Sequence, residues 1–297
     1  MPSVSIVMAT YNRAHLIGET IQSVLGQGFP EFEYIIADDG SNDGTEEIVK
    51  SIGDPRIVYF KRPHTGRLSS LRNFCHSKCR GEFIAYVDSD DIWMPGKLDM
   101  QVKVLNQHPG AGFSFTDIEL FNDRGTIQPS LYKREGLEVC NVFSQLLRNE
   151  LVICHTTLVI RRSVLGLVGE NDESFLSGDH DLVFRMSHAT EAAILYYPLV
   201  KVRRHAQNTS YGDIYRLQGF DEHHRTLKKL LDSRKITNEE YSKAMSNTSY
   251  AFASQSLVYG DHERAIHYLK KSLAGNPWNV KAWLRMGLML AKKVFRF

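Results

Sequence analysis

The sequence predicts an α/β domain followed by an all-helical region, and three observations lead to this prediction. The first hundred residues contain short apolar runs, rich in Val, Ile and Tyr, with the composition of buried strands. Stretches whose apolar residues recur every three or four positions separate these runs, which is the period of an amphipathic helix. From about residue 211 onwards, only the helical period is found. Strands that alternate with helices indicate a largely parallel sheet with helices on both faces.

Four apolar runs mark the strands of the expected sheet, at residues 4–9, 33–37, 56–60 and 82–87. Leu16, Ile21 and Val24 belong to the apolar face of a helix between the first two runs, and Gly26 ends this helix. Residues 38–52 begin as a polar turn and continue as a helix with an acidic first turn, where the helix macrodipole favours negative charge. Ligands of such sheets bind outside the carboxyl ends of the strands. The polar residues directly after each run are therefore the first candidates for a functional site.

The chain from residue 101 to about 210 is less regular, and we expect it to complete the same domain. Its predicted elements are a helix at 95–107, a strand at 111–120, a short helix around 142–147, a strand and helix within 155–169, and a last strand within 192–205. Asp179 and Asp181 precede the apolar residues of one further helix, as carboxylates at a helix start do. The expected domain spans residues 1–210.

The remaining residues, 211–297, are expected to form a helical tail that resembles a tetratricopeptide unit. The small, turn and apolar positions of that repeat are matched by Ala253, Gly260, Ala265, Leu269 and Pro277. Fewer than three such units do not stand alone, so the tail should pack on the domain or on a protein partner. The basic and apolar residues 282–297 fit either a helix on an anionic membrane surface or a terminal helix that packs on the preceding unit, and we favour the second.

Composition and charge exclude several classes of protein. Of the 297 residues, 42% are hydrophobic and 24% are charged, which is ordinary for a globular protein and excludes disorder. The formal net charge of +2 is too small for an extended nucleic-acid surface, so no nucleic-acid partner is expected. No apolar run approaches the roughly 20 residues of a membrane span, and the N-terminus lacks the basic start of a signal peptide. We expect a cytoplasmic protein that touches a membrane at most peripherally, on its inner face.

The four cysteines are expected to be reduced thiols with structural roles. Cys75 and Cys79 are one helical turn apart with His76 between them, so a zinc pair is the alternative. A second close pair of cysteines is missing from the sequence, and we therefore favour the structural role.

Three carboxylates, Asp88, Asp90 and Asp91, follow the fourth apolar run within four positions. Like charges this close repel each other unless a cation or hydrogen-bond donors offset them. An isolated D-x-D is often a solvated turn or a helix cap, but here it follows a buried strand, and a second acidic pair, Asp38 and Asp39, follows another. Oxygen ligands without His or Cys nearby favour Mg²⁺ or Mn²⁺, whose coordination shell phosphate oxygens complete. The pattern predicts a metal and diphosphate site without the glycine-rich phosphate loops of kinases and dehydrogenases.

These motifs make the chain similar to the family 2 glycosyltransferases, which have the GT-A fold of nucleotide-diphospho-sugar transferases. The resemblance covers residues 1 to about 210 through five segments in the same order: VSIVMATYNRAHLIGETIQSVLGQ, EYIIADDGSNDGT, LRNFCHSKCRGEFIAYVDSDDIWMPGKL, SGDHDLVFRM and RRHAQNTS. It implies a Rossmann-like mixed sheet flanked by helices, with a nucleotide-sugar half at 1–100 and an acceptor half at 101–210.

The resemblance also implies how a donor, most simply a UDP-sugar, is bound. The residues around its base and ribose would be Thr10, Tyr11, Asp38 and Asp39. Among these, Asp39 is the better candidate for the base.

The D-x-D of the family corresponds to Asp88-Ser89-Asp90. Asp90 is implied as the direct ligand of Mn²⁺ or Mg²⁺, and Asp88 would lie nearer the ribose or the water shell of the metal. His205 matches a family histidine near the metal and the diphosphate, and a structural role is its alternative. The arginine–asparagine step before the metal strand corresponds to Arg72 and Asn73.

The family's general base is the aspartate of an E-D pair, which reads Gly178-Asp179 in this chain. Asp179 would take the proton from the acceptor hydroxyl, whereas the loss of the glutamate leaves open what replaces its contact with the acceptor. Asp181 is a neighbouring carboxylate that we interpret as a helix-cap residue.

The implied activity is an inverting transfer of a sugar from a nucleotide diphosphate to a saccharide or lipid-linked acceptor, in bacterial cell-surface polysaccharide or glycolipid synthesis. One alternative is a sugar nucleotidyltransferase, but such enzymes need a glycine-rich basic loop after the first strand, and MATYNRAHL contains no glycine. The other is an inactive nucleotide-sugar-binding module whose tail recruits partners. The presence of Asp88, Asp90 and Asp179 argues against it, and the departure at Gly178 keeps it open.

Overall fold

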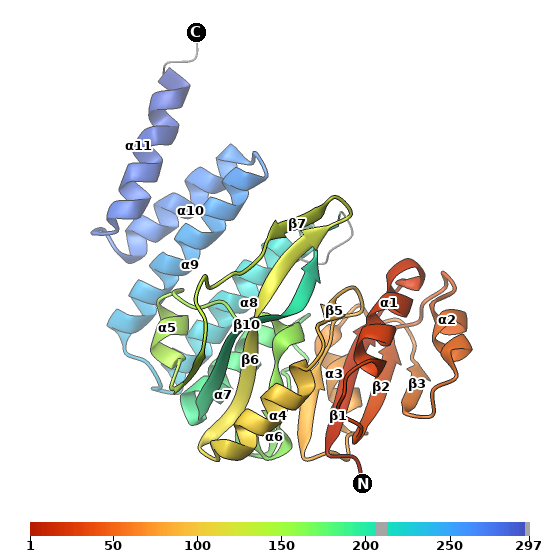
Figure 1. The fold of residues 1–297 in the computed structure, drawn as a ribbon. Helices are drawn as coiled ribbons and strands as arrows, with labels where there is room; N and C mark the ends of the chain where they lie inside the picture. The colour runs from red at the N-terminus through yellow and green to blue at the C-terminus, as the bar shows by residue number, and fades with distance from the viewer. Residues whose placement is uncertain (206–212, 295–297) are drawn as a thin grey trace. The chain divides into compact units, whose positions relative to one another are not determined.

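The computed structural model describes the backbone of residues 1–205 and 213–294 and the side chains of residues 1–205 and 218–289 (Figure 1). The chain divides into two units, one formed by Met1–Val142 with Ile153–Asn208 and the other by Phe143–Val152 with Thr209–Phe297. Residues 143–152, which lie inside the expected acceptor half, thus group with the helical residues that follow the α/β domain.

The first unit is built on a mixed sheet, which confirms the predicted fold class. Its strands run in the order β3-β2-β1-β4-β9-β6-β10-β5, with β7 beside β6 and β8 beside β10. The strands are β1 (Val4–Thr10), β2 (Phe32–Asp38), β3 (Ile57–Lys61), β4 (Phe83–Tyr86), β5 (Ile92–Trp93), β6 (Ala111–Asn122), β7 (Gly125–Gln128), β8 (Leu137–Cys140), β9 (Val159–Arg161) and β10 (Glu191–Arg203).

Parallel pairing brings the polar ends of three strands to one edge of the sheet. β1 pairs in parallel with β2 and with β4, and the registers place Thr10 beside Asp38 and Val7 beside Tyr86. The residues after β1, β2 and β4 therefore emerge at the same edge. From the other side, β10 pairs antiparallel with β5, which places Lys201 beside Ile92 and carries the end of β10 towards the loop after β4.

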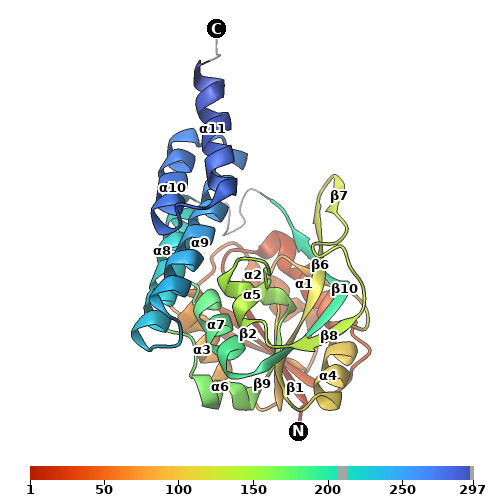
Figure 2. The same cartoon turned by 90° about the vertical axis from the view of Figure 1, so that its left-hand side faces the viewer.

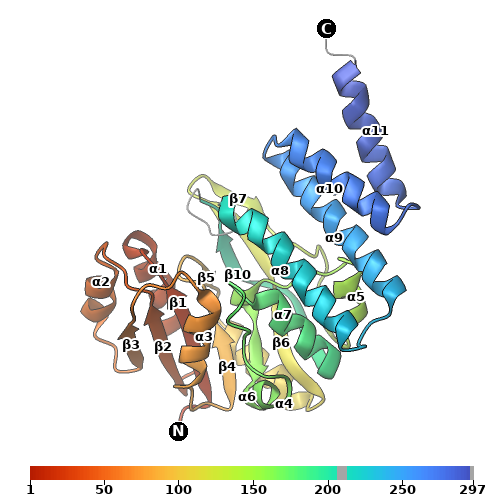
Figure 3. The ribbon, with the colours of Figure 1, turned by 180° about the vertical axis from the view of Figure 1, so that it is seen from behind.

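Helices cover both faces of this sheet. In Figure 1, α1 and α4 lie on the near face, and Figure 3 shows α3, α6 and α7 on the opposite face. The helices of the first unit are α1 (Ala14–Leu25), α2 (Thr45–Ile52), α3 (Leu68–His76), α4 (Lys97–Gln107), α6 (Arg162–Val168) and α7 (Asp179–Ala189), with the 3-10 helix η1 (His155–Thr157). The predicted apolar face of α1 is buried at Ile21 and Val24 in the same core as Ile6 and Met8 of β1.

The second unit consists of helices, as predicted for the tail. They are α5 (Phe143–Leu147), α8 (Asp213–Asp232), α9 (Asn238–Val258), α10 (His262–Gly275) and α11 (Val280–Val294). α9 and α10 lie side by side (Figure 2), and the approach is close because a Cβ at Gly275 would lie 2.9 Å from the carbonyl oxygen of Ser242. Ala253, Ala265 and Leu269, three of the residues matched to a tetratricopeptide unit, are fully buried in the core of this unit.

The helix α11 has both a buried and an exposed apolar face. Ala282 and Met286 pack in the core of the helical unit, whereas Trp283, Leu284 and Leu288 are exposed. The described part of α11 thus packs on the preceding helices, while residues 295–297 of the predicted terminal helix lie outside the described residues. Among the described helices, none combines the length and the apolar character needed to cross a membrane.

Candidate active site

Two hydrogen bonds to neighbouring segments, one of them buried, hold the loop after β4. The backbone N–H of Asp88 donates to the hydroxyl of Thr156 in η1 (3.3 Å), and the carboxylate of Asp91 accepts a bond from the backbone N–H of Arg203 (3.0 Å). Asp91 is buried, and burial, followed by the neighbouring carboxylates, raises its pKa well above the usual range. Asp91 therefore anchors the loop, and Asp88 and Asp90 are left facing the strand ends.

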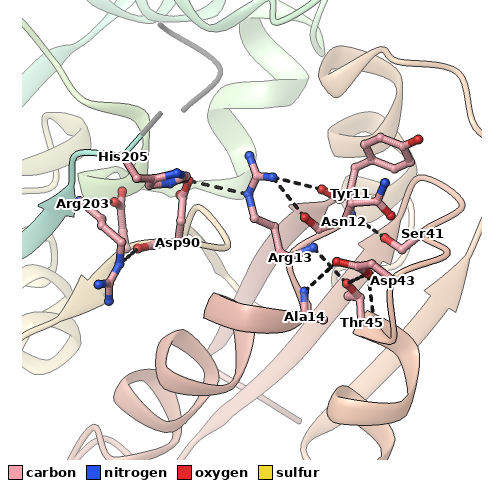
Figure 4. Close-up of polar contacts among 11 residues, drawn as sticks. Tyr11, Asn12, Arg13, Ala14, Ser41, Asp43, Thr45, Asp90, Arg203 and His205 are labelled. Atoms are coloured by element: carbon pink, nitrogen blue, oxygen red, sulfur yellow. Dashed lines mark hydrogen bonds and ion pairs between the residues drawn. The ribbon is translucent and has the colours of Figure 1, made fainter. Parts of the chain in front are cut away.

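The carboxylate of Asp90 lies among cationic or proton-binding groups (Figure 4). Its Oδ2 is 3.0 Å from Nε2 of His205 and 3.7 Å from Nε of Arg13. Arg13 directly follows the loop after β1, and His205 directly follows β10. The predicted metal ligands Asp90 and His205 are thus neighbours, although they lie 115 residues apart in the sequence.

Arg203 fixes the end of β10 against this loop. Its Nε donates to the backbone oxygen of Asp90 (3.2 Å), and its Nη2 forms an ion pair with Glu19 of α1. Two separate parts of Arg203, its backbone N–H and its side chain, therefore hold Asp91 and Asp90, and this fixes the backbone from which His205 extends.

Asp179, the predicted base, meets the donor side of the site through Arg72. Arg72 of α3 is buried; its Nη1 pairs with Oδ1 of Asp179, and its Nη2 is 3.6 Å from Oδ1 of Asp88. Burial works to raise the pKa of Asp179, but Arg72, aided by His155, holds it below the usual value. Partial burial, with added repulsion from Asp90 and Asp179, raises the pKa of Asp88, and Arg72 opposes this shift.

Gly178, which we predicted to replace the glutamate of the family's E-D pair, adopts a left-handed backbone with a φ of +72° before α7. A Cβ at this position would lie 3.4 Å from atoms of Asn171 and Ser69. Glycine is the residue that takes up this conformation without strain. A glutamate side chain therefore has no unstrained place here in the described conformation.

Three buried aromatic side chains lie beneath Asp179. The ring of His155 packs 4.2 Å from that of Tyr86, and the hydroxyl of Tyr86 is 2.9 Å from Nε2 of His76. Within the described part of the chain, neither ring nitrogen of His155 has a hydrogen-bond partner, and its Nε2 is 3.8 Å from Oδ1 of Asp179. Burial and Arg72 lower the pKa of His155 to about 3 and that of His76 to about 4, so both rings are neutral at physiological pH.

The second acidic pair, Asp38 and Asp39, is occupied by bonds within the protein. Asp38 accepts hydrogen bonds from the backbone N–H of Ser41 (2.7 Å) and the hydroxyl of Tyr59 (2.5 Å). Asp39 accepts bonds from the backbone N–H groups of Thr65 (2.9 Å) and Gly66 (2.8 Å). Both carboxylates are buried.

The other residues predicted around the nucleoside lie at the same strand ends. Tyr11 is partly exposed, and its ring stacks on that of His64 at 4.2 Å, while His64 Nδ1 is 2.8 Å from Asp39. Thr10 is buried, and its hydroxyl has no hydrogen-bond partner among the described residues. Ser89 is buried between Asp88 and Asp90.

Several other predicted residues have structural contacts. Asn73 binds the backbone of Asn171 through both ends of its amide, at 2.9 and 3.0 Å. Asp181 accepts a bond from Arg185 one turn along α7 (2.8 Å), and Arg185 also donates to the backbone oxygen of Gly169 (2.9 Å). The thiol of Cys79 donates to the carbonyl of Cys75 (3.2 Å), and burial raises its pKa to about 12.

The structure adds residues that the sequence analysis did not single out, namely Arg13, Arg203, His155 and Thr156. Arg13 and Arg203 lie within the first and last segments of the resemblance, and we assigned neither of them a role of its own from the sequence. His155 and Thr156 are in a stretch that we interpreted as the start of a strand, and no local signal distinguishes them. They reach the site because η1 lies under the loop after β4.

A family model described as Glycosyl transferase family 2 matches residues 5–167, which is more than half of the chain. The chain belongs to glycosyl transferase family 2. This confirms the resemblance on which the site assignments depend.

Curated relatives of this glycosyltransferase include an uncharacterised glycosyltransferase of Rickettsia typhi, 29% identical over 74% of this chain and 70% of its own. Another is the UDP-Glc:alpha-D-GlcNAc-diphosphoundecaprenol beta-1,3-glucosyltransferase WfgD of Escherichia coli, 31% identical over 54% of this chain and 61% of its own. A third is the putative teichuronic acid biosynthesis glycosyltransferase TuaG of Bacillus subtilis, 32% identical over 54% of this chain and 63% of its own.

Solved structures share the GT-A fold with this glycosyltransferase. Residues 1–349 of Staphylococcus aureus TarS superpose with a TM-score of 0.67 at 18% identity, covering 93% of this chain and 81% of TarS 1–349. The mannosyltransferase PcManGT of Pyrobaculum calidifontis, in complex with GDP-Man and Mn²⁺, superposes with a TM-score of 0.65 at 16% identity, covering 99% of this chain and 81% of its own. At these identities the likeness concerns the fold alone.

Proposed function

We propose that this glycosyltransferase transfers a sugar, with inversion, from a nucleoside-diphosphate donor to an acceptor hydroxyl in bacterial cell-surface polysaccharide or glycolipid synthesis. The observation that carries the proposal is the position of Arg72 between Asp88 and Asp179. Arg72 thus links the D-x-D loop, which would hold the departing diphosphate, to Asp179, which would act on the acceptor. Both ends of the proposed reaction therefore lie in one site.

In the proposed reaction, the acceptor oxygen attacks the anomeric carbon as the bond from that carbon to the diphosphate breaks. The electron pair of the broken bond leaves with the diphosphate, and the proton of the acceptor hydroxyl passes to Asp179. Because attack and departure occur on opposite faces of the sugar, its configuration inverts. Asp179 lies at the first residue of α7 with its side chain partly exposed, where an acceptor has access to it.

The residues that would hold a divalent cation are Asp90 and His205, with Asp88 nearby. These residues fit a divalent cation, since a carboxylate oxygen of Asp90 and an imidazole nitrogen of His205 lie only 3.0 Å apart and can converge on one ion. Among the described residues, no three His, Cys, Asp or Glu side chains form a complete metal cage, so the remaining ligands would be donor phosphates and water, as Mn²⁺ and Mg²⁺ accept. When bound, the cation supplies Lewis-acid neutralisation of the departing diphosphate.

We propose a UDP-sugar as the donor and a saccharide or lipid-linked acceptor. The name of the E. coli relative gives UDP-Glc and a diphosphoundecaprenol acceptor, one TarS structure contains UDP-GlcNAc, and PcManGT contains GDP-Man. The partly exposed Tyr11 ring, stacked on His64, offers a flat surface for a base.

The test is the release of nucleoside diphosphate from UDP-, GDP- and dTDP-sugars with Mn²⁺, in the wild type and in Asp90→Asn, Asp179→Asn and Asp99→Asn variants. Asp99 is an exposed carboxylate in the first turn of α4 and serves as the matched control. We expect metal-dependent turnover of one donor, lost in Asp90→Asn and retained in Asp99→Asn. Donor binding in a thermal-unfolding assay without turnover, even with saccharide and lipid-linked acceptors supplied, would favour the inactive module instead.

For the cell location we propose peripheral attachment to the inner face of the membrane through α11. Trp278 and Trp283 are exposed next to Leu284 and Leu288, and residues 280–297 carry five basic side chains and no acidic one. Exposed tryptophans and apolar side chains with a positive charge suit an anionic bilayer surface.

Sedimentation with vesicles of anionic and of zwitterionic phospholipid tests this attachment. We expect the wild type to sediment with the anionic vesicles and a Trp283→Ser/Leu284→Ser variant to remain in solution. Val258→Ser, which removes an exposed apolar side chain at the end of α9, is the control. Equal sedimentation of all three proteins would remove α11 as the attachment site.

A further inference from the structure

His155 is placed against the predicted base in a way that packing alone does not explain. Its side chain is 6% exposed, and among the described residues neither Nδ1 nor Nε2 has a hydrogen-bond partner. Buried polar atoms in folded proteins nearly always have a partner, and one that lacks it in one state often gains it in another. The nearest charged acceptor for Nε2 is Oδ1 of Asp179, at 3.8 Å.

The ring of His155 cannot easily turn elsewhere, because Tyr86 packs against it. Tyr86 is itself buried and held through its hydroxyl by His76, so the support for His155 extends into α3. On its other side, η1 continues into Thr156, whose hydroxyl binds the backbone of Asp88. Nε2 therefore stays directed at Asp179, and a small movement of that carboxylate closes the gap to a hydrogen bond.

Binding of a donor would move the Asp179 carboxylate by drawing away the Arg72 guanidinium with which it pairs. In the described structure its carboxylate is paired with Arg72, which also lies near Asp88 on the donor side. A guanidinium stabilises the negative charge of a carboxylate and so weakens it as a base, whereas a neutral imidazole N–H orients a carboxylate with less loss of basicity. The diphosphate of a donor is a competing anion for Arg72.

We propose that His155 is a positioning residue for the transfer, which donates its Nε2–H to Asp179 when donor binding draws Arg72 towards the diphosphate. This inference rests on the proposed function of Asp179 as the base. The groups that face His155 are Tyr86 of β4, Arg72 and His76 of α3, and Asp179 of α7. Burial and Arg72 lower the pKa of His155 to about 3, so its ring remains a neutral donor across the working pH range.

The first test does not need activity. Long-range ¹H–¹⁵N correlation spectra of the ¹⁵N-labelled chain report the tautomer of each histidine, and the His155→Phe variant assigns the resonance. We expect a neutral ring at pH 5.5 that carries its proton on Nε2, and a change of its shifts in Asp179→Asn. A ring protonated on Nδ1 only would overturn the proposal, because Nε2 would then have no proton to donate.

The second test uses the donor that the wild type turns over. His155→Phe keeps a ring against Tyr86, and we expect kcat to fall about ten- to a hundredfold with an unchanged KM for the donor, as for loss of an orienting group. His155→Gln, which retains an N–H donor, should restore part of kcat. The acidic limb of the kcat profile should move to higher pH in His155→Phe, because an N–H donated to the carboxylate of Asp179 favours its charged form and so lowers its pKa.

A matched control separates positioning from packing. His76→Phe removes the other buried histidine of the cluster, which binds Tyr86 and not Asp179, and should keep more than half of kcat. In an Asp179→Asn background, His155→Phe should have no further effect. Equal losses in His76→Phe and His155→Phe, or a His155→Phe kcat within twofold of wild type, would overturn the proposal. If no donor is turned over by the wild type, the proposed function fails, and the tautomer still decides whether His155 donates towards Asp179.

Discussion

Two acidic pairs lie at the ends of β2 and β4, the parallel strands on either side of β1, and the structure uses them differently. Asp38 and Asp39, after β2, accept short hydrogen bonds from backbone N–H groups and from Tyr59. Asp88 and Asp90, after β4, face the cationic side chains of Arg72 and Arg13 at 3.6 and 3.7 Å, and Asp90 also faces His205. The sequences of the two stretches, ADDGS and VDSDD, give little hint of this difference.

The two pairs differ in the kind of group that binds each carboxylate, which is the backbone in one case and a side chain in the other. The backbone N–H groups of Ser41, Thr65 and Gly66 are part of the loops themselves, so their bonds to Asp38 and Asp39 belong to the fold. Side chains such as Arg13 and Arg72 can turn away when another cation or an anion arrives. Asp38 and Asp39 therefore shape the loops that would surround a nucleoside, and Asp88 and Asp90 retain the ability to bind a ligand.

The largest effects should separate the two pairs by activity. Asp179→Asn should lower kcat by about a hundred- to ten-thousandfold, the usual contribution of general-base catalysis, and Asp90→Asn should abolish the metal-dependent part of turnover. Asp90→Asn should unfold in urea near the wild-type midpoint, since it removes one of several crowded negative charges. Asp179→Asn should unfold at a lower urea concentration, because the buried Arg72 loses the carboxylate with which it pairs. A clear loss of stability in Asp90→Asn would mean that the pair after β4 is also structural.

The reverse result is expected for Asp39. Asp39→Ala removes the acceptor for two backbone N–H groups, and we expect the free energy of unfolding to fall by about 2–3 kcal/mol, since hydrogen bonds to charged groups are among the stronger ones. Urea titration of both variants gives the comparison directly. An Asp39→Ala protein with unchanged stability and weakened donor binding would show that Asp39 acts on the base itself.

The free energy of unfolding should fall at acidic pH because of the buried His76. Burial and Arg72 lower the pKa of His76 to about 4, below the value of an unfolded histidine, so below pH 6.5 the unfolded chain binds the additional proton. This contribution to stability is complete above pH 6.5 and is lost as the pH falls towards 4, by about 2 kcal/mol at pH 5. The unfolding free energy of His76→Phe, measured from pH 7.5 to 5, should therefore have a smaller pH slope than that of the wild type. Identical slopes would contradict the neutral state of this ring.

The smallest expected effect concerns the bond between Tyr59 and Asp38. Tyr59→Phe removes a donor to the buried carboxylate, and we expect a loss of about 1 kcal/mol of stability with little change of kcat. Thermal unfolding and donor turnover, measured on the same preparation, test both parts. A large loss of kcat would place Asp38 among the donor-binding groups.

The strands and the strand-end residues could be predicted from sequence because local patterns encode them. The four apolar runs became β1 to β4, and the polar residues after β1, β2 and β4 emerge at one edge because their strands are parallel. What could not be predicted depends on contacts between distant segments. No pattern near His155 indicates that η1 approaches the loop after β4, and the residues that occupy Asp39 lie 26 and 27 positions away. The approach of the end of β10 was implied only by the resemblance of the segment that contains His205.

The grouping of residues 143–152 with the helical unit affects how this protein is made. Asn149 and Arg148 hydrogen-bond to Thr248 and Asn247 of α9, which a ribosome synthesises about one hundred residues later. The α/β unit is also interrupted at this point, since it resumes at Ile153. During synthesis, residues 143–152 therefore leave the ribosome before the α9 residues to which they hydrogen-bond. Ending translation before α9 would leave residues 143–152 without these partners, so the catalytic unit is not obtained by simply omitting the tail.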